Sequence, residues 1–246
     1  MLLKDKTALV TGASSGIGAA IAKAFAAEGA FVIINYLKNK SGAESTLAAV
    51  RKWSDGMIMQ ADLTSEEQVA AMFRQIEKDG TSLDILVNNV GAYFAGDEWN
   101  MDNAAWEQTF KTNVLAALSV SKHAAEQFVK NKKGVMVNIA SVRGNKPRPT
   151  AIAYGASKAG VISLTQSYAK LLAPFGRANS ISPGIVNAGY WLTAPAKELK
   201  EEQKNIPMQK LVQPEDVANL VVFLASDQSA MITGQNIAVD GGYLLN

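Results

Sequence analysis

The chain has 246 residues, of which 48% are hydrophobic and 19% are charged, and its 24 basic and 22 acidic side chains leave a net charge of +2. This near-neutral balance gives no electrostatic reason to expect binding to nucleic acid or to an anionic membrane. Cysteine is absent and histidine occurs once, which excludes disulfides, thiolate nucleophiles, zinc–thiolate sites and multi-histidine metal sites, so we expect no metal.

The N-terminal segment, Met1 to Lys6, has no apolar stretch of the kind found in signal peptides. Elsewhere, no apolar run approaches the roughly 20 residues that a membrane-spanning helix needs. These features predict a soluble protein that stays in the cytoplasm.

Short apolar runs alternate along the chain with longer amphipathic segments. The apolar runs, which predict strands, lie at residues 7–10, 31–34, 57–59, 85–87, 135–139, 180–182 and 236–239. The amphipathic segments, which predict helices, lie near residues 17–28, 42–53, 66–78, 103–131, 152–173 and 215–225. Continuous apolar strands separated by helices indicate a parallel sheet covered on both faces. We therefore expect a doubly wound, Rossmann-type α/β fold of about seven strands. Because no linker interrupts the alternation, residues 1–246 are interpreted as one domain.

A polar segment at residues 188–209 departs from this alternation. It contains Pro195 and Pro207 and carries Tyr190 and Trp191 near its start. We interpret it as a mobile lid with a short helix, placed beside a substrate pocket.

A glycine-rich turn, Thr11 to Gly18, follows the first predicted strand and opens the first predicted helix. Gly12 permits a tight turn, Gly16 lets the backbone approach a pyrophosphate, and Gly18 allows the helix to pack closely on the strand. Free N–H groups at the start of the helix favour an anion. The pattern, G-x-x-x-G-x-G, therefore predicts a dinucleotide site, and the alternative is a glycine-rich turn without a ligand.

Tyr154 and Lys158 are four residues apart in a predicted helix, so they share one face of it. A free tyrosine has a pKa of about 10, and a cation within about 4–6 Å lowers that pKa because it favours the phenolate. The two side chains can therefore transfer a proton near neutral pH. Taken alone, the spacing more often reflects an exposed tyrosine beside a solvated lysine.

With these two motifs, the chain resembles the short-chain dehydrogenase/reductase family in its short, single-domain form. Further matching segments occur in the family's order over nearly the whole length: Asn88-Asn89-Val90-Gly91, Lys111-Thr112-Asn113-Val114, Asn138-Ile139-Ala140-Ser141, Pro183-Gly184 and Val239-Asp240-Gly241-Gly242. The resemblance implies a nicotinamide cofactor and hydride transfer between it and a carbonyl or alcohol substrate.

The resemblance also implies a role for each of four catalytic residues. Tyr154 is expected to be the general acid in carbonyl reduction and the general base in alcohol oxidation, while Lys158 lowers the pKa of the phenol and binds the nicotinamide ribose. Ser141 is expected to donate a hydrogen bond to the substrate oxygen, and Asn113 to support a water chain that resupplies protons. The alternatives are a strand-end cap for Ser141 and a structural amide for Asn113.

The cofactor contacts implied by the resemblance lie in several segments. They are Gly12, Ser14, Ser15, Gly16, Ile17, Gly18, Asn35, Tyr36, Lys38, Asp62, Leu63, Asn89, Val90, Gly91, Tyr154, Lys158, Pro183, Gly184, Val186 and Asn187. Among them, Asp62 with Leu63 resembles the family's adenine contact. The alternative for Asp62 is a cap of the helix that follows it.

The end of the second predicted strand bears on the choice of nicotinamide. NAD enzymes of this shape carry an acidic residue there that binds the ribose 2′-hydroxyl, whereas this chain has Asn35, Tyr36, Leu37 and Lys38. We therefore expect NADP(H) in preference to NAD(H), with Lys38, assisted by Ser15 or Asn39, near the 2′-phosphate. The alternative is that Lys38 and Lys40 are loop residues whose charges are solvated and do not contact the cofactor.

Three features depart from the family pattern. Asn187 stands where the family often has a threonine that meets the nicotinamide carboxamide, so that contact is left open, and Val90 adds bulk where alanine is usual. The segment from Phe175 to Asn179 is one residue shorter than the common form, which we expect to alter a surface turn only. His123 matches no family motif and is interpreted as a helical surface or interface residue.

Three segments are expected to choose the substrate: residues 93–99, residues 143–150 and the lid. They supply the aromatic side chains Tyr93, Phe94, Trp99, Tyr190 and Trp191 and the cations Arg143, Lys146 and Arg148. An apolar pocket with a basic rim suits an acyl chain on a phosphorylated carrier, so reduction of a 3-oxoacyl thioester or a similar ketone is the leading hypothesis. The alternative is that these three cations lie in surface loops and are exposed to solvent.

Two other functions are kept open. Dehydrogenation of a sugar or another small secondary alcohol fits the same core, because function depends on the site and not on the fold. A non-catalytic NADP-binding sensor or scaffold is a hypothesis from a different class. For any of them, the resemblance implies a homotetramer with D₂ symmetry, built on the helices near 103–131 and 152–173 and on the C-terminal strand.

Overall fold

The computed structural model describes residues 1–79, 82–94 and 96–246. Seven parallel strands form one sheet in the order β3-β2-β1-β4-β5-β6-β7. The strands are β1 (Thr7–Val10), β2 (Phe31–Tyr36), β3 (Gly56–Gln60), β4 (Ile85–Asn88), β5 (Gly134–Ile139), β6 (Gly176–Pro183) and β7 (Asn236–Val239). The prediction of a Rossmann-type sheet of about seven strands is confirmed.

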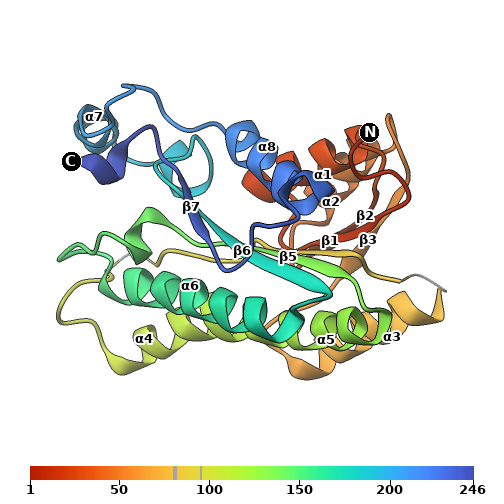
Figure 1. Cartoon of the computed structure of the whole chain (residues 1–246). Helices are drawn as coiled ribbons and strands as arrows, with labels where there is room; N and C mark the ends of the chain where they lie inside the picture. The colour runs from red at the N-terminus through yellow and green to blue at the C-terminus, as the bar shows by residue number, and fades with distance from the viewer. Residues whose placement is uncertain (80–81, 95) are drawn as a thin grey trace.

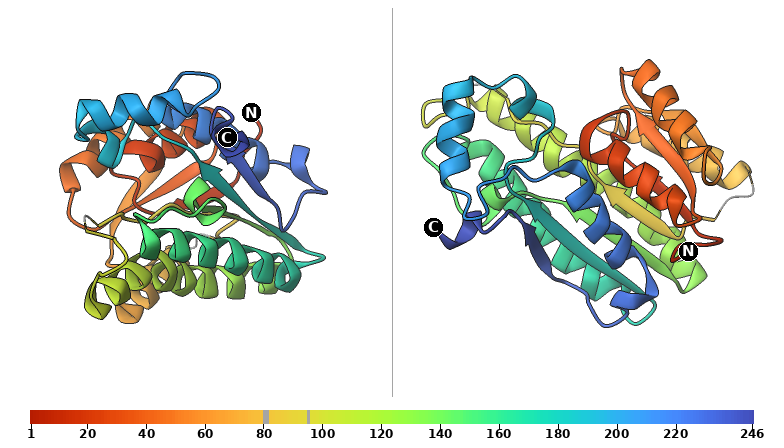
Figure 2. Two further views of the ribbon diagram at one scale, coloured as in Figure 1. Left: turned by 90° about the vertical axis from the view of Figure 1, so that its left-hand side faces the viewer. Right: turned by 90° about the horizontal axis from the view of Figure 1, so that it is seen from above.

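Helices cover both faces of the sheet (Figure 1). One face carries α1 (Gly16–Ala27), α2 (Lys40–Val50) and α8 (Pro214–Ala225), and the other carries α3 (Glu66–Lys78), α4 (Asn103–Phe110), α5 (Ala116–Asn131) and α6 (Ile152–Leu172). A further helix, α7 (Ala196–Lys204), lies beside the C-terminus (Figure 2). None of the helices in the described part of the chain is long and apolar enough to cross a membrane.

Two hydrophobic clusters fill the space between the sheet and its helices. Phe25 of α1 packs in one cluster with Val10 of β1, whereas Phe73 of α3 and Phe128 of α5 pack in the other with Leu9. Leu9 and Val10 are neighbours in β1, so successive side chains enter opposite layers, as they do in a strand buried on both faces. Because both faces of these strands are buried, consecutive residues in their sequences are apolar.

The order of the strands reverses between β1 and β4, and the ends of these two strands are hydrogen-bonded to each other. The backbone N–H of Asn89 donates to Thr11 Oγ1 over 2.9 Å, and Asn89 Nδ2 donates to the carbonyl of Thr11 over 2.9 Å. In open α/β sheets, ligands bind in the crevice outside such a switch point. The fold thereby places the glycine-rich turn beside the Asn88–Gly91 segment.

The helix predicted over residues 103–131 is continuous, but its hydrogen bonding changes in the middle. Between α4 and α5, residues Lys111–Leu115 form a π-helical turn. Within it the buried Asn113 accepts from the backbone N–H of Ala92 over 2.7 Å and donates to Ser157 Oγ over 2.9 Å. Turns of this kind occur frequently at functional sites, and here the turn directs an amide toward both α6 and the loop after β4.

The polar segment at residues 188–209 contains the short helix that was predicted for it, α7, preceded by a 3₁₀ turn at Gly189–Leu192. Its apolar side chains join a third, smaller cluster. Trp191, Leu199 and Ile206 pack there with Ile185 and Tyr243. The segment is therefore held between the end of β6 and the C-terminal residues.

Candidate active site

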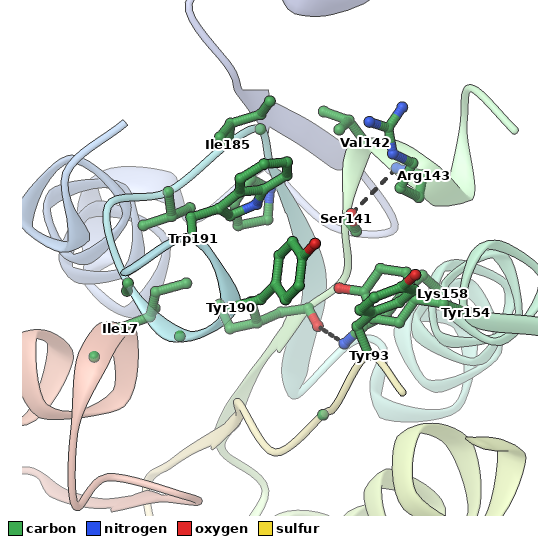
Figure 3. A pocket seen from close by; sticks show the side chains of 18 of the residues that line it. Ile17, Tyr93, Ser141, Val142, Arg143, Tyr154, Lys158, Ile185, Tyr190 and Trp191 are labelled. Carbon is green, nitrogen blue, oxygen red and sulfur yellow. Dashed lines mark hydrogen bonds between the residues drawn. The ribbon is translucent and has the colours of Figure 1, made fainter. Parts of the chain in front are cut away.

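A cavity of about 400 Å³ lies at the carboxyl ends of the strands. Its walls come from the glycine-rich turn, the loops after β4, β5 and β6, the first turns of α6, and the segment 188–209 (Figure 3). The predicted site residues that line it are Gly12, Ser15, Gly16, Ile17, Asn89, Gly91, Ser141, Tyr154, Lys158, Pro183, Gly184 and Val186. The structure thus brings the glycine motif and the Tyr154–Lys158 motif to one site.

The glycine-rich turn is closely packed where it meets the switch point. Gly12 has a φ of +61°, and a Cβ on it would lie 2.9 Å from Val90 Cγ2. A Cβ on Gly18 would lie 2.6 Å from both Asn89 Nδ2 and the carbonyl of Gly12. Ser15 precedes α1 without a side-chain cap bond, and the first turn of α1 carries no acidic residue. The N–H groups at the start of this helix are therefore suited to hold a pyrophosphate at the cavity wall.

Tyr154 and Lys158 lie together as their spacing predicted. Lys158 Nζ is 5.8 Å from the centroid of the Tyr154 ring and donates to the carbonyl of Ile139 over 2.9 Å. Gly91 leaves room for this ammonium, since a Cβ there would lie 2.7 Å from Nζ. Lys158 is buried, and burial lowers its pKa to about 8.

The pKa of Tyr154 differs from the sequence expectation. Burial raises the pKa of the phenol, while interaction with the Ser141 hydroxyl and the positive charge of Arg143 act in the opposite direction. The upward shift prevails because the surroundings are desolvated. The lowering of the pKa expected from Lys158 does not offset burial in this structure, in which the ammonium is directed at the carbonyl of Ile139.

Ser141 lies just beyond β5, at the cavity. Its Oγ accepts from the backbone N–H of Arg143 over 3.1 Å and so caps the short 3₁₀ turn Val142–Gly144. A hydroxyl that accepts one hydrogen bond retains its own proton for donation. The strand-end cap and the predicted contact with a substrate oxygen are therefore compatible.

Asn113 has the contacts of a structural amide. Besides accepting from Ala92, it donates to the carbonyl of Ala92 over 3.0 Å, and its partner Ser157 donates to the carbonyl of Tyr154 over 2.7 Å. These bonds connect the loop after β4 to the turn of α6 that carries Tyr154. The water chain expected at Asn113 stays a prediction.

The remaining predicted cofactor residues lie outside the lining of the cavity: Ser14, Gly18, Asn35, Tyr36, Lys38, Asp62, Leu63, Val90 and Asn187. Asn35 is buried, accepts from the backbone N–H of Gly12 over 3.3 Å and donates to the carbonyl of Ala61 over 3.3 Å. The Asn35 side chain thus links the glycine-rich turn to the segment after β3 by hydrogen bonds. Lys38 is exposed at the end of β2.

Asp62 and Asn187 each have a local partner. Asp62 Oδ1 accepts from the backbone N–H of Thr64 over 2.9 Å and from its hydroxyl over 2.8 Å, and these bonds lower the pKa of Asp62. Ser65, rather than Asp62, caps α3. Asn187 Nδ2 donates to Gln213 Oε1 over 3.2 Å, toward the start of α8. Their predicted cofactor contacts stay predictions.

Aromatic side chains form one wall of the cavity. The Tyr93 ring is 6.0 Å from that of Tyr154 and 5.4 Å from that of Tyr190, and Tyr190 is 5.2 Å from Trp191, all edge to face (Figure 3). Three of the predicted aromatic residues therefore reach the site. Trp99 lies outside the lining and is 83% exposed, and Ala95, within the same predicted segment, lies outside the described residues.

The predicted basic rim takes another form, because its cations are bound within the protein. Arg143 and Arg148 donate to the Tyr243 hydroxyl over 3.0 and 2.6 Å, and both pair with the buried carboxylate of Glu202 in α7. Lys146 donates to the carbonyl of Asn246. The three cations thus have partners within the protein, and they connect the loop after β5 to α7 and the C-terminus. No motif or spacing in the sequence identifies Glu202 or Tyr243 as their partners.

Replacing Glu202 with Gln tests this network. We expect the free energy of unfolding to fall by about 1–3 kcal/mol, because the partly buried guanidinium groups of Arg143 and Arg148 would lose their shared counter-charge. Urea denaturation measures this loss. Glu201→Gln, at an exposed neighbouring position of α7, is the matched control and should change stability by less than about 0.5 kcal/mol. Equal losses in the two variants would contradict the network's importance.

His123 lies on the outer helical layer and not at the cavity. Its ring stacks on Phe73 with 5.2 Å between centroids, and its Nε2 is 3.4 Å from Glu66 Oε1. These contacts join α5 to α3. They agree with a helical, non-catalytic residue.

Known proteins are similar in sequence to nearly the whole chain. The family model described as Enoyl-(Acyl carrier protein) reductase matches residues 12–244. A 3-oxoacyl-[acyl-carrier-protein] reductase, FabG, of Staphylococcus aureus is 38% identical over 240 residues, which cover 96% of this chain and 97% of that protein.

Solved structures agree closely with the fold. A putative gluconate dehydrogenase from Agrobacterium tumefaciens has a TM-score of 0.94 at 31% identity, covering 98% of this chain and 97% of that one. An NAD⁺-bound xylitol dehydrogenase has a TM-score of 0.93 at 30% identity, and the match covers 98% of this chain and 100% of that one.

The doubly wound sheet, the glycine-rich turn and the cavity that joins them to Tyr154 define an oxidoreductase that uses a nicotinamide cofactor. The matches span nearly all of the sequence. The chain belongs to the short-chain dehydrogenase/reductase family.

Proposed function

We propose that this enzyme is an NADP(H)-dependent reductase whose substrate is a 3-oxoacyl thioester or a similar ketone. The observation that carries the proposal is the convergence of Ser141, Tyr154 and Lys158 with the glycine-rich turn on one cavity. The relative from Staphylococcus aureus, named as a 3-oxoacyl-[acyl-carrier-protein] reductase, supports this choice of substrate.

The cofactor, when bound, supplies or accepts the hydride. Tyr154 donates a proton to the carbonyl oxygen, and its raised pKa keeps the phenol protonated for this step at neutral pH. Ser141 donates a hydrogen bond to the same oxygen, and the nearby Lys158 ammonium stabilises negative charge left on Tyr154. The turn around Gly12 and Gly16 holds the pyrophosphate. Because alcohol oxidation needs the phenolate, it should become faster as pH rises, whereas reduction is favoured near neutrality.

Oxidation of a sugar alcohol or related polyol is the second candidate. The polar residues Arg148, Thr150 and Glu198 line the cavity and suit a hydroxylated substrate better than a long acyl chain. The gluconate and xylitol dehydrogenases of similar structure agree with this candidate. Assays with 3-oxo esters and NADPH, beside polyols and NADP⁺, separate the two. Cofactor binding without turnover of any substrate would favour a sensor or scaffold instead.

The preference for NADP(H) is supported by the end of β2, where no carboxylate is present to repel a 2′-phosphate and Lys38 is exposed. The first turn of α2, which follows the loop that carries Lys38, lies against the glycine-rich turn, since a Cβ on Gly42 would be only 2.4 Å from the carbonyl of Ser14. A 2′-phosphate bound beside Ser15 would therefore be near this loop.

Lys38→Ala should lower the ratio of kcat/KM for NADPH to that for NADH by about tenfold or more, because a charge-assisted hydrogen bond contributes about 1.5–3 kcal/mol. Steady-state kinetics with both cofactors measure the ratio. Lys40→Ala is the control, since Lys40 pairs with Glu44 at 3.7 Å, and it should leave the ratio nearly unchanged. A parent enzyme without any preference for NADPH would overturn the proposal.

We further propose that residues 1–246 act as one nucleotide-binding domain, with residues 188–209 as its lid. A Cβ on Gly16 would lie 3.5 Å from that of Ala188, so the start of the segment is in contact with the glycine-rich turn, and both line the cavity. Exposed apolar residues on the outer helices, Leu115, Leu118 and Leu171, support assembly into a homotetramer. Sedimentation should give a tetramer, and a monomer at micromolar concentration would contradict this.

A further inference from the structure

Asp97, in the loop between β4 and α4, is only 1% exposed and binds the start of the helix that carries Tyr154. Its Oδ1 accepts from the backbone N–H of Ala153 over 2.8 Å, and its Oδ2 accepts from the backbone N–H of Tyr154 over 2.7 Å. Its own carbonyl accepts from the N–H of Ala151 over 2.6 Å. Three hydrogen bonds thus join this loop to the first turn of α6.

The start of α6 depends on this remote residue because it has no cap of its own. The residue before the helix is Ala151, which has a φ of +65° and no side-chain acceptor. A helix leaves its first N–H groups unpaired unless a side chain accepts from them, and a carboxylate is favoured there by the helix dipole. Asp97 supplies that carboxylate from a loop more than 50 residues away in the chain.

The same loop forms part of the substrate wall. Tyr93 lines the cavity and lies edge to face with both Tyr154 and Tyr190. The bonds of Asp97 therefore fix two parts of the cavity relative to each other, the aromatic wall on the loop and the phenol on α6.

We propose that Asp97 is a positioning residue, which holds Tyr154 in register with the substrate wall so that its phenol meets the carbonyl oxygen beside Ser141. This inference rests on the proposed function, because it takes Tyr154 as the proton donor. Misplacement of a reacting group by about 1 Å can lower a rate by about 100-fold, so the loss of these bonds should be measurable in kcat.

The Asp97 carboxylate lies 2.7 Å from the backbone nitrogen of Tyr154, and burial together with the charge of Asp97 raises the pKa of the neighbouring Tyr93. The other charged or titratable groups that face Tyr154 are Lys158 on the same helix, Arg143 after β5, Tyr93 on the Asp97 loop, and Tyr190 on the lid. A nearby carboxylate disfavours the phenolate. Neutralising Asp97 should therefore move the pH profile of alcohol oxidation toward lower pH, an effect that a purely structural cap would not produce.

The experiment compares Asp97→Asn with Asp102→Asn. Asp102 is an exposed carboxylate of the same connection that caps α4 by accepting from the N–H of Ala105 over 2.7 Å, so both variants remove one capping charge. We expect Asp97→Asn to lower kcat by about 10- to 100-fold, to change KM less than kcat, and to move the pH profile. NADPH affinity, measured by fluorescence titration, should stay within about twofold of the parent, and Asp102→Asn should resemble the parent in every assay.

Asp97→Ser, whose shorter side chain retains one acceptor without the charge, serves as a second variant if Asp97→Asn does not fold. A kcat within about twofold of the parent, or a lowered kcat with an unmoved pH profile, would overturn the positioning role. Tyr154→Phe separates this failure from failure of the proposed function. An inactive Tyr154→Phe beside a fully active Asp97→Asn refutes the role of Asp97 alone, whereas an active Tyr154→Phe refutes the proposed function itself.

Discussion

Replacing Tyr154 with phenylalanine should lower kcat for ketone reduction by about 10²- to 10⁴-fold, the range that a general acid contributes. The ring would keep its place in the aromatic wall beside Tyr93, so the variant loses a proton donor and little packing. Cofactor binding should be nearly unchanged, because the glycine-rich turn is untouched. Steady-state oxidation of NADPH with a 3-oxo ester measures the change in kcat, and fluorescence titration measures the affinity.

Tyr93→Phe is the matched control for that prediction. Its phenol lies in the same cavity, and burial and nearby carboxylates raise its pKa, yet no part of the proposed chemistry uses it as the proton donor. We expect its kcat to stay within about tenfold of the parent, an effect of about 1.4 kcal/mol or less. If Tyr93→Phe lost as much activity as Tyr154→Phe, the assignment of the proton donor would be wrong.

Lys158→Met should lower kcat by about 10²- to 10³-fold, as expected for removal of an electrostatic stabiliser in a desolvated site. The substitution has a second expected effect, on stability. Burial lowers the pKa of Lys158 from its ordinary value of 10.5 to about 8, so holding its charge inside the folded protein costs about 3 kcal/mol at neutral pH.

The direction of the pH dependence follows from proton binding. Between pH 8 and pH 10.5 the unfolded chain binds more protons at Lys158 than the native protein does, so the stability of the parent rises with pH across this window. Relative to Lys158→Met, the cofactor-free parent should therefore gain about 3 kcal/mol between pH 7 and pH 11. Denaturant titrations at both pH values measure the gain. With Lys170→Met, an exposed position of the same helix, the difference should stay flat, and a flat difference for Lys158→Met would contradict its buried charge.

Much of the fold could be predicted because the strands are buried on both faces. Where a strand contains polar residues the prediction fell short, as in β6, expected over residues 180–182 and observed over Gly176–Pro183. Arg177 and Asn179 belong to this strand because partners elsewhere in the chain bind their polar groups, among them the carbonyls of Ser226 and Ile232. Hydropathy alone cannot reveal such partners.

The contacts of the candidate site also fall into a group that the sequence predicts and a group that it does not. Contacts set by helical spacing, such as Tyr154 with Lys158, were predictable, and so was the meeting of the glycine turn with the end of β4. The bonds of Asp97 and the pairing of Glu202 with Arg148 depend on residues more than 50 positions apart, for which the sequence carries no local signal. The pKa of Tyr154 departs from the prediction for a related reason: burial is a property of the assembled structure, and it outweighs the lowering expected from the helical neighbour Lys158.

The central claim is that Ser141, Tyr154 and Lys158 carry out proton transfer beside a nicotinamide cofactor bound at the glycine-rich turn. Rapid mixing of the NADPH-loaded enzyme with a panel of 3-oxo esters, thioesters and polyol-derived ketones, followed at the absorbance of the reduced nicotinamide, tests it most directly. We expect at least one ketone to oxidise one NADPH per site and to yield an equal amount of alcohol, and we expect Tyr154→Phe to slow this turnover by about 10²-fold or more. Tight NADPH binding with no oxidation by any ketone, or equal rates for the parent and Tyr154→Phe, would contradict it.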